Sequence, residues 1–276
     1  LVIPLGYGIV AVGFSRITYH MSRITHHASR VLSNSGIVVL AAGCTTSMLL
    51  ALFLTLSRGA WIGAGVAAVA VGMLLSRRAA LLSLLAGAAL VFGLALGGIE
   101  RLPPALANRV TDFVPYLNVF DVEVRGVGIT DQNFAVIERL AHWQAAYEMW
   151  ADEPWLGQGV GNYAAVYPAY YIPPWEEPLG HAHNLFLNTL AEAGLIGLVA
   201  YLIFWTGALA LSFRAVRSSA GIWRGVAVGI LGAMVHLHVH NFFDNLYVHG
   251  MYLHLALLLA IAARLVQGET QLEESE

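Results

Sequence analysis

The sequence is short of charge and of cysteine, and it contains no lysine. Its 276 residues are 58% hydrophobic and only 11% charged, with a net charge of −3, which is far from the average of globular proteins. All 14 basic residues are arginines, and they form no clustered basic patch of the kind that binds nucleic acid. The single cysteine, Cys44, lies in an apolar run and excludes both a disulfide framework and a cysteine-based metal site.

Long apolar stretches without a charged residue are what the sequence has in abundance. Stretches of this length can cross a bilayer as helices. The expected spans are a partial one at Leu1–Ser15, then Val31–Ser57, Gly59–Ser76, Ala79–Ile99, Ala193–Phe213, Gly225–Phe243 and Asn245–Ala263. The predicted fold class is all-α, a polytopic transmembrane helix bundle with a long, partly helical extracytoplasmic loop at about 100–184. We expect 1–276 to be a single membrane domain, truncated at its N-terminus, because it opens inside an apolar stretch that is not a signal peptide.

The distribution of arginine predicts how the spans are oriented. Cytoplasmic connectors carry an excess of basic residues, and three connectors are rich in arginine, at residues 16–30, 77–78 and 214–224. Alternation of the spans then places Arg58, the region 100–192 and the turn at Asp244 together on the extracytoplasmic side. Arg58 is the only charge between Val31 and Ser76, so it is either a headgroup-level turn residue or a functional arginine.

The predicted loop contains an amphipathic helix and a cluster of aromatic residues. Helical spacing of apolar side chains predicts a helix at Gln132–Ala151, with Arg139 and His142 on its more polar face. A glycine-rich run, 157–162, indicates a flexible turn, because no strand precedes it as in a nucleotide-binding loop. The aromatic residues that follow fit either an interfacial belt or a platform for sugar rings.

The densest polar signal is the segment from Gly180 to Leu185, directly before an apolar helix. It holds His181 and His183, which cannot both face lipid and are therefore expected in a bundle interior or a watery pocket. His183 is a candidate general base, because imidazole titrates near physiological pH. A structural capping role is equally open, and Asn184 is a candidate N-cap of the helix that follows.

Three ordered blocks of residues resemble a known family. The first is Ser57-Arg58-Gly59, and the second is Arg139 followed by Trp143, Ala146, Met149, Pro154 and the glycine-rich run. The third is His183-Asn184, nine residues, Gly194, two residues and Gly197. Together they are similar to the signature of the O-antigen ligase and O-antigen polymerase superfamily of bacterial polytopic membrane proteins.

The resemblance implies a membrane glycosyltransferase that needs no metal or other cofactor. Its partners would be membrane lipids, a lipid-linked oligosaccharide donor of the undecaprenyl-diphosphate type, and a glycan or lipid acceptor with a reactive hydroxyl. The protein would lie in the bacterial inner membrane as a multi-pass protein, with its site on the extracytoplasmic side. In family terms His183 is the catalytic base, Arg58 and Arg139 bind the diphosphate, and His181 and Asn184 are neighbours that contact substrate.

Two other functions stay open on the sequence. A polytopic transporter, similar to bicarbonate-transporter relatives of this superfamily, would place its polar residues near the bilayer midplane on broken helices. A membrane metalloenzyme could use His236, His240 and Asp244, which fall at i, i+4 and i+8 on one helical face. The sequence does not distinguish ligase from polymerase, because both use the same class of donor.

Overall fold

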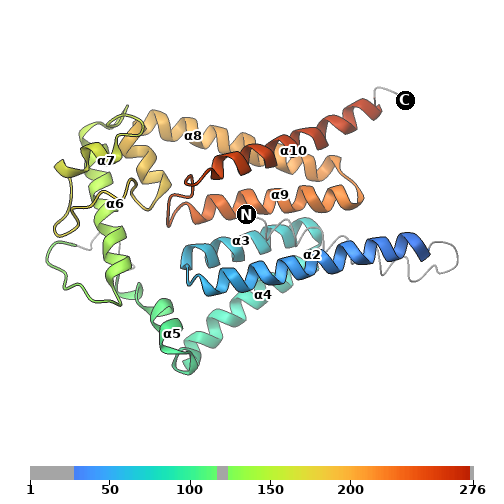
Figure 1. Ribbon diagram of the computed structural model, residues 1–276, viewed down its shortest axis with the longest axis horizontal. Helices are drawn as coiled ribbons and strands as arrows, with labels where there is room; N and C mark the ends of the chain where they lie inside the picture. The colour runs from blue at the N-terminus through green and yellow to red at the C-terminus, as the bar shows by residue number, and fades with distance from the viewer. Residues whose placement is uncertain (1–27, 117–123, 274–276) are drawn as a thin grey trace. The chain divides into compact units, whose positions relative to one another are not determined.

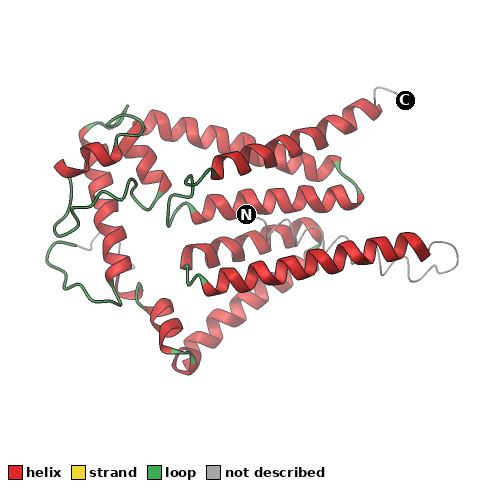
Figure 2. Ribbon diagram, viewed as in Figure 1, coloured by secondary structure: helices red, strands yellow, loops and turns green. Residues whose placement is uncertain are grey.

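The computed structural model describes residues 28–116 and 124–273, and these ranges contain helices, turns and loops but no strand (Figures 1 and 2). The all-α fold class is confirmed. The expected first span, Leu1–Ser15, and most of the first connector lie outside the described residues. The chain divides into two compact units, one made of residues 1–91, 206–239 and 247–276, the other of residues 92–205 and 240–246.

The first unit consists mainly of long apolar helices. They are α2 (Ala28–Leu54), α3 (Arg58–Leu75), α4 (Arg77–Gly93), the later part of α8 (Leu185–Ser218), α9 (Gly221–His240) and α10 (Met251–Glu273). In the described residues of the chain, five helices are long and apolar enough to cross a membrane, and α2 adds a shorter apolar stretch, Val38–Leu54. The chain is therefore a multi-pass membrane protein, as its hydropathy predicts.

Small residues let the helices of the first unit pack closely. A Cβ atom on Gly63 of α3 would lie 3.0 Å from the backbone oxygen of His236 in α9, so these two helices touch through their backbones. Arg224, at the start of α9, donates hydrogen bonds to the carbonyl oxygens of Leu74 and Val216, each at 3.4 Å. This arginine therefore joins the end of α3 to the end of α8.

The junction of α2 and α3 places Arg58 at a helix start. Ser57 is the N-cap of α3, and its side chain accepts a hydrogen bond from the backbone N–H of Ala60 at 3.4 Å. The indole N–H of Trp61 reaches back to the carbonyl of Leu52 at 3.1 Å and fastens the two helices together. Ser57-Arg58-Gly59 is thus a helix junction, as predicted, and Arg58 is the first residue of α3.

The second unit contains the predicted loop. Its elements are the π-turn η1 (Leu94–Gly98), η2 (Ile99–Arg101), α5 (Pro104–Thr111), η3 (Val114–Tyr116), α6 (Phe134–Asp152), α7 (Tyr163–Val166), η4 (Tyr167–Ala169) and the first part of α8. The predicted helix is confirmed as α6. The prediction that His142 lies on its more polar face was wrong, because this side chain is only 1% exposed. Two of the aromatic residues that follow the glycine-rich run, Tyr163 and Tyr167, are also buried against α6. They are part of the hydrophobic core and form neither an interfacial belt nor a platform for sugar rings.

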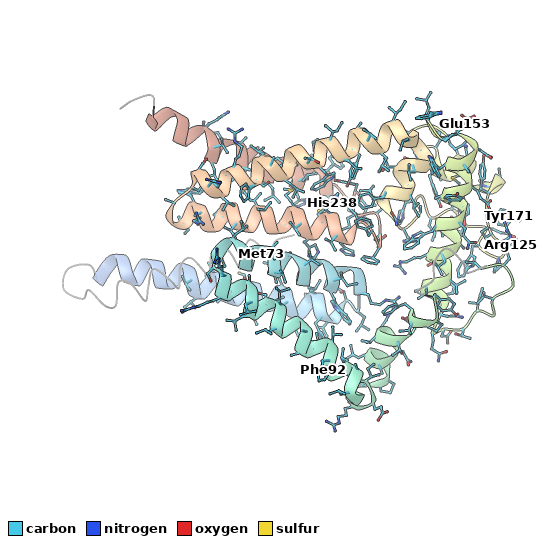
Figure 3. All side chains as sticks on the ribbon, turned by 180° about the vertical axis from the view of Figure 1, so that it is seen from behind. Met73, Phe92, Arg125, Glu153, Tyr171 and His238 are labelled. Carbon is cyan, nitrogen blue, oxygen red and sulfur yellow. The ribbon has the colours of Figure 1, made fainter. Side chains whose placement is uncertain are left out.

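The helix α8 is broken at Gly194, and the glycine-rich run fills the break. Gly194 has φ 63° and ψ −166°, and a Cβ atom there would lie 2.3 Å from the carbonyl of Trp155. The segment that begins after Glu153, at the end of α6 (Figure 3), exchanges backbone hydrogen bonds with α8. The N–H of Leu195 bonds to Pro154 at 2.8 Å, and the carbonyl of Ala191 accepts from Gln158 at 2.8 Å. Gly194 is therefore a site where the backbone of another segment approaches closely.

The last span also differs from its predicted bounds. Helix α9 ends at His240 and α10 begins at Met251, whereas the apolar pattern predicted a start at Asn245. The intervening residues form a turn in which the side-chain oxygen of Asn241 accepts from the N–H of Leu246 at 3.1 Å. The carbonyl of Asn241 accepts from the N–H of Leu185 at 2.9 Å, so the turn is attached to the start of α8.

Candidate functional site

His183 is held in an unusual backbone conformation directly before α8. Its φ is 51°, in the left-handed region, which costs a residue with a Cβ about 1–3 kcal/mol. The carbonyl of His183 accepts from the indole N–H of Trp143 at 3.2 Å, and its backbone N–H donates to Nδ1 of His181 at 3.1 Å. The surrounding contacts thus fix the conformation, and such strain is typical of functional positions.

Two asparagines stabilise the segment that carries His183. The Oδ1 atom of Asn184 accepts from the backbone N–H groups of Phe186 at 3.0 Å and Leu187 at 3.1 Å, which is the geometry of an N-cap. Asn188, one turn into α8, accepts from the N–H of Ala182 at 3.0 Å through its own Oδ1. The capping role of Asn184 is confirmed, and its contact with substrate stays a prediction.

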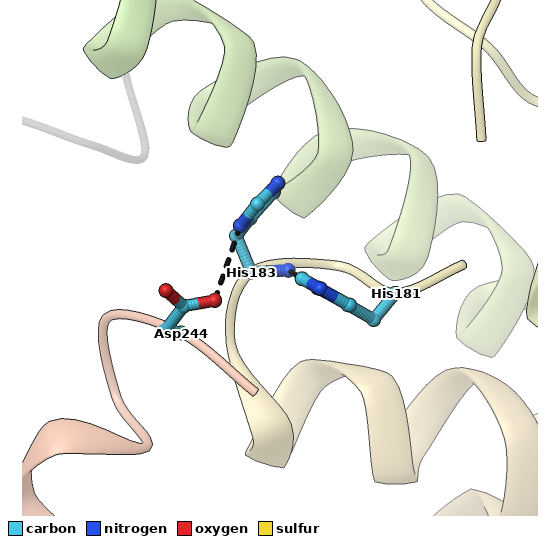
Figure 4. A group of neighbouring side chains, drawn as sticks. All are labelled: His181, His183 and Asp244. Atoms are coloured by element: carbon cyan, nitrogen blue, oxygen red, sulfur yellow. Dashed lines mark hydrogen bonds and ion pairs between the residues drawn. The ribbon is translucent and has the colours of Figure 1, made fainter. Parts of the chain in front are cut away.

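The side chain of His183 is paired with a carboxylate. Its Nδ1 lies 3.2 Å from Oδ1 of Asp244, which comes from the turn between α9 and α10 (Figure 4). The other ring nitrogen, Nε2, is buried and makes no hydrogen bond to any part of the chain that the structure describes. A neutral imidazole whose Nδ1–H donates to a carboxylate has its lone pair on Nε2. The carboxylate therefore favours the tautomer in which Nε2 is the basic nitrogen of the ring.

The electrostatic environment keeps Asp244 ionised. Burial acts to raise the pKa of this carboxyl group, but hydrogen bonds from His183 and the N–H of Asn245 outweigh it, and the pKa is lowered overall. The positive charge of Arg139 acts in the same direction. Nε of Arg139 donates to the carbonyl of Phe243 at 3.3 Å, next to Asp244, and Nη1 donates to Ala135 at 2.7 Å. Arg139 therefore belongs to the same cluster as the pair.

Two further histidines surround His183, and both favour the neutral form. The pKa of His181 is lowered by burial and by the nearby His183, with Asp244 acting against the shift. The pKa of His142 is lowered to about 4, mainly by burial. His142 packs edge-on against His183 with ring centroids 5.7 Å apart, stacks on Tyr167 at 4.8 Å, and lies 3.0 Å through Nδ1 from the hydroxyl of Tyr163. Besides the carboxylate of Asp244, the base candidate thus contacts the rings of two histidines that favour the neutral form.

The same cluster is the one group in the described residues that could hold a metal ion. Candidate ligand atoms of His181, His183 and Asp244 lie within 4.8 Å of one another. However, Nδ1 of His181 already accepts a backbone hydrogen bond, and Nδ1 of His183 already faces Asp244. The alternative set that the sequence left open, His236, His240 and Asp244, is not such a group in the part of the chain that the structure describes.

The structure brings together most of the residues that the sequence pointed to. Arg139, His181 and His183 form one cluster in the second unit, whereas Arg58 belongs to the first. Asp244 was not predicted as the partner of His183. The predicted topology offered a signal for it, because it placed both residues on the same side of the membrane. Nothing in the sequence indicated that His142 is buried beside His183, since this burial depends on how the loop folds.

His183 and Asp244 both lie outside the helices that are long and apolar enough to cross a membrane. His183 lies before the spanning helix that starts at Leu185, and Asp244 lies after the one that ends at His240. A transporter would need such groups near the bilayer midplane.

A family model described as O-antigen ligase matches residues 43–202, which is more than half of the chain and includes Arg58, Arg139 and His183. No curated protein matches the chain.

Proposed function

The chain belongs to the O-antigen ligase family, whose members are membrane glycosyltransferases, and on this premise we propose that it transfers a glycan from an undecaprenyl-diphosphate donor to an acceptor hydroxyl. We place the reaction on the extracytoplasmic face of a bacterial inner membrane, without a metal ion. The acceptor, whether a lipid or a growing glycan, is left open by this proposal.

The observation that carries the proposal is the pairing of His183 with Asp244. The acceptor hydroxyl gives its proton to Nε2 of His183 while its oxygen attacks the anomeric carbon of the donor sugar. The bond from that carbon to the diphosphate oxygen breaks, and the diphosphate leaves with the electron pair. The carboxylate of Asp244 stabilises the imidazolium that forms, because its negative charge lies 3.2 Å from Nδ1.

Arginines would hold the diphosphate and stabilise its developing charge. Two of the five N–H donors of Arg139 are used for backbone carbonyls, which leaves the guanidinium able to bind phosphate oxygens. We assign the same role to Arg58, on the strength of its place in the family blocks and of the predicted topology. The permanent charge of arginine replaces the metal that many phosphate-handling enzymes need.

Substitution of His183 tests the proposal directly. A general base contributes about 10²–10⁴-fold, so His183→Gln should lower transfer by that factor while donor binding changes little. The activity of the wild type should also fall on the acid side, because only a neutral ring accepts the proton. His254→Gln is the matched control, since this exposed histidine lies in α10 and belongs to the first unit. Near-normal transfer by His183→Gln would show that the histidine has a structural role and is not the general base.

The arginine assignment has its own test. Arg139→Lys and Arg58→Lys keep the charge but lose the planar fork, and one charge-assisted hydrogen bond is worth about 1.5–3 kcal/mol, or about 10–100-fold. Donor affinity should fall by that factor at equal membrane level. Arg125→Lys is the control, because Arg125 forms an exposed ion pair with Glu148 at 3.5 Å. Unchanged donor affinity in Arg139→Lys would remove this residue from the diphosphate site.

A metal-dependent alternative makes a different prediction. If His181, His183 and Asp244 held a catalytic cation, a chelator would abolish transfer and one divalent metal would restore it. We expect transfer by the purified protein to survive chelation.

A further inference from the structure

The segment that fills the break in α8 carries apolar side chains that the protein does not cover. Trp155, Leu156 and Val160 are 64%, 69% and 83% exposed. They lie in the second unit, outside every helix that is long and apolar enough to cross a membrane in the described residues. Three exposed apolar side chains so close in sequence need an explanation, because water-exposed surfaces rarely gather them without a partner.

The hydrogen bonds of the segment fix its height along α8. The stretch after the break, Leu195–Phe213, has no charged residue, and as a helix it rises about 28 Å, close to the thickness of the hydrocarbon core. Glu192 precedes this stretch and Arg214 follows it, which is the pattern of a span whose two ends lie near the two faces of a membrane. The segment bonds to the first turn of this stretch, through Pro154 to Leu195 at 2.8 Å and Trp155 to Ile196 at 3.3 Å.

The backbone of the segment is suited to this depth. In a continuous helix the N–H groups of Leu195 and Ile196 would bond to the carbonyls of Ala191 and Glu192. Here those carbonyls accept instead from the N–H groups of Gln158 and Gly159 at 2.8 and 2.9 Å. Both sides of the break are therefore paired, which removes the main cost of irregular backbone near hydrocarbon.

From this position we infer that residues 153–160 form an interfacial anchor, in which Trp155, Leu156 and Val160 enter the lipid leaflet beside the start of the membrane-spanning part of α8. Tryptophan is the residue most typical of this level, because its ring is apolar and its N–H can stay in the headgroup region. The exposed side chain of Ile196, 56% exposed on the helix itself, continues the same apolar surface. The partner is a lipid surface, and the inference does not depend on the transfer reaction.

A depth measurement with a fluorescent probe tests the anchor. Val160→Cys in a Cys44→Ser background gives one labelling site, and an environment-sensitive dye is attached to the full chain reconstituted in phosphatidylcholine vesicles. We expect blue-shifted emission, strong quenching by lipids with a nitroxide near the headgroup, and weak quenching by iodide. Glu176→Cys, an exposed polar position of the same unit, is the matched control and should show the opposite pattern.

Two results would overturn the anchor. Quenching of the Val160 probe by iodide as strong as that of the Glu176 probe would place the segment in water. Protection from both quenchers would show that a protein surface covers it.

Discussion

At the scale of single residues, the position of Asp244 decides what His183 can do. A histidine alone can donate or accept a proton through either ring nitrogen. The carboxylate at 3.2 Å from Nδ1 favours the tautomer whose lone pair is on Nε2, and it stabilises the charged ring after proton transfer. The general-base role that we propose for His183 would therefore use a residue outside the signature.

Replacing Asp244 by asparagine should lower transfer by about 10²–10⁴-fold, because the neutral amide neither fixes the tautomer nor stabilises the imidazolium. Asp244→Glu, which keeps the charge, should recover part of the loss. Asp131→Asn, in an exposed turn of the same unit, is the control for loss of one negative charge. Initial rates with a lipid-linked donor are the measurement. Wild-type rates in Asp244→Asn would show that His183 does not need the carboxylate of Asp244 for transfer.

His142 should make the second unit sensitive to acid. Its pKa in the folded protein is about 4, below its ordinary value of 6.5, so the unfolded chain binds this proton more readily. The stability that neutral His142 contributes is complete above pH 6.5 and is lost as the pH falls from 6.5 towards 4. Hydrogen exchange of α6 and α7 should accelerate across this window in the wild type.

The His142→Gln variant isolates that effect, because it keeps a polar side chain that does not titrate. Its exchange in α6 should change less between pH 6.5 and 4 than that of the wild type, while other carboxylates and histidines are common to both proteins. An identical acid dependence in the two proteins would show that the proton is taken up elsewhere.

At the scale of elements, the break in α8 joins the loop to the membrane helix. Gly194 is in a conformation that side chains rarely adopt, and the backbone of Trp155 occupies the space where a Cβ would lie. Gly157 meets α8 in the same way, with Glu192 and Ala193 at 2.5–2.6 Å from its ideal Cβ. The two glycines form a reciprocal contact between the loop and the helix.

Gly194→Ala should therefore release the loop from α8. The new methyl group collides with backbone, which cannot move aside as a flexible side chain can, so the four exchanged hydrogen bonds should weaken. Exchange of the N–H groups in 155–163 should rise markedly, and transfer should fall with it. Gly207→Ala, later in α8 with open space around its ideal Cβ, is the matched control. If residues 155–163 kept their protection from hydrogen exchange in Gly194→Ala, the contact between the loop and α8 would not depend on this glycine.

At the scale of the whole molecule, the open question is which side of the membrane each connector faces. The arginine distribution places Arg78 in the cytoplasm and the region around Glu176 outside. In a Cys44→Ser background, a cysteine at Glu176 should react with a membrane-impermeant reagent added to intact cells, and one at Arg78 should react only after permeabilisation. The reverse pattern would move the site to the cytoplasmic face.

The sequence by itself determined the helical membrane architecture, the helix that became α6, and His183 with Arg139 as candidate site residues. The helices follow from local patterns, because hydropathy over about 20 residues and helical periodicity are set by neighbouring positions. Arg139 was indicated by the resemblance to the family, and His183 by that resemblance together with its place before an apolar helix. Only the tertiary structure decided that Asp244 faces His183, that His142 is buried, and that Gly194 breaks α8. Each of these depends on contacts between residues far apart in the chain, such as the 61 positions that separate His183 from Asp244, and no local pattern encodes such a contact.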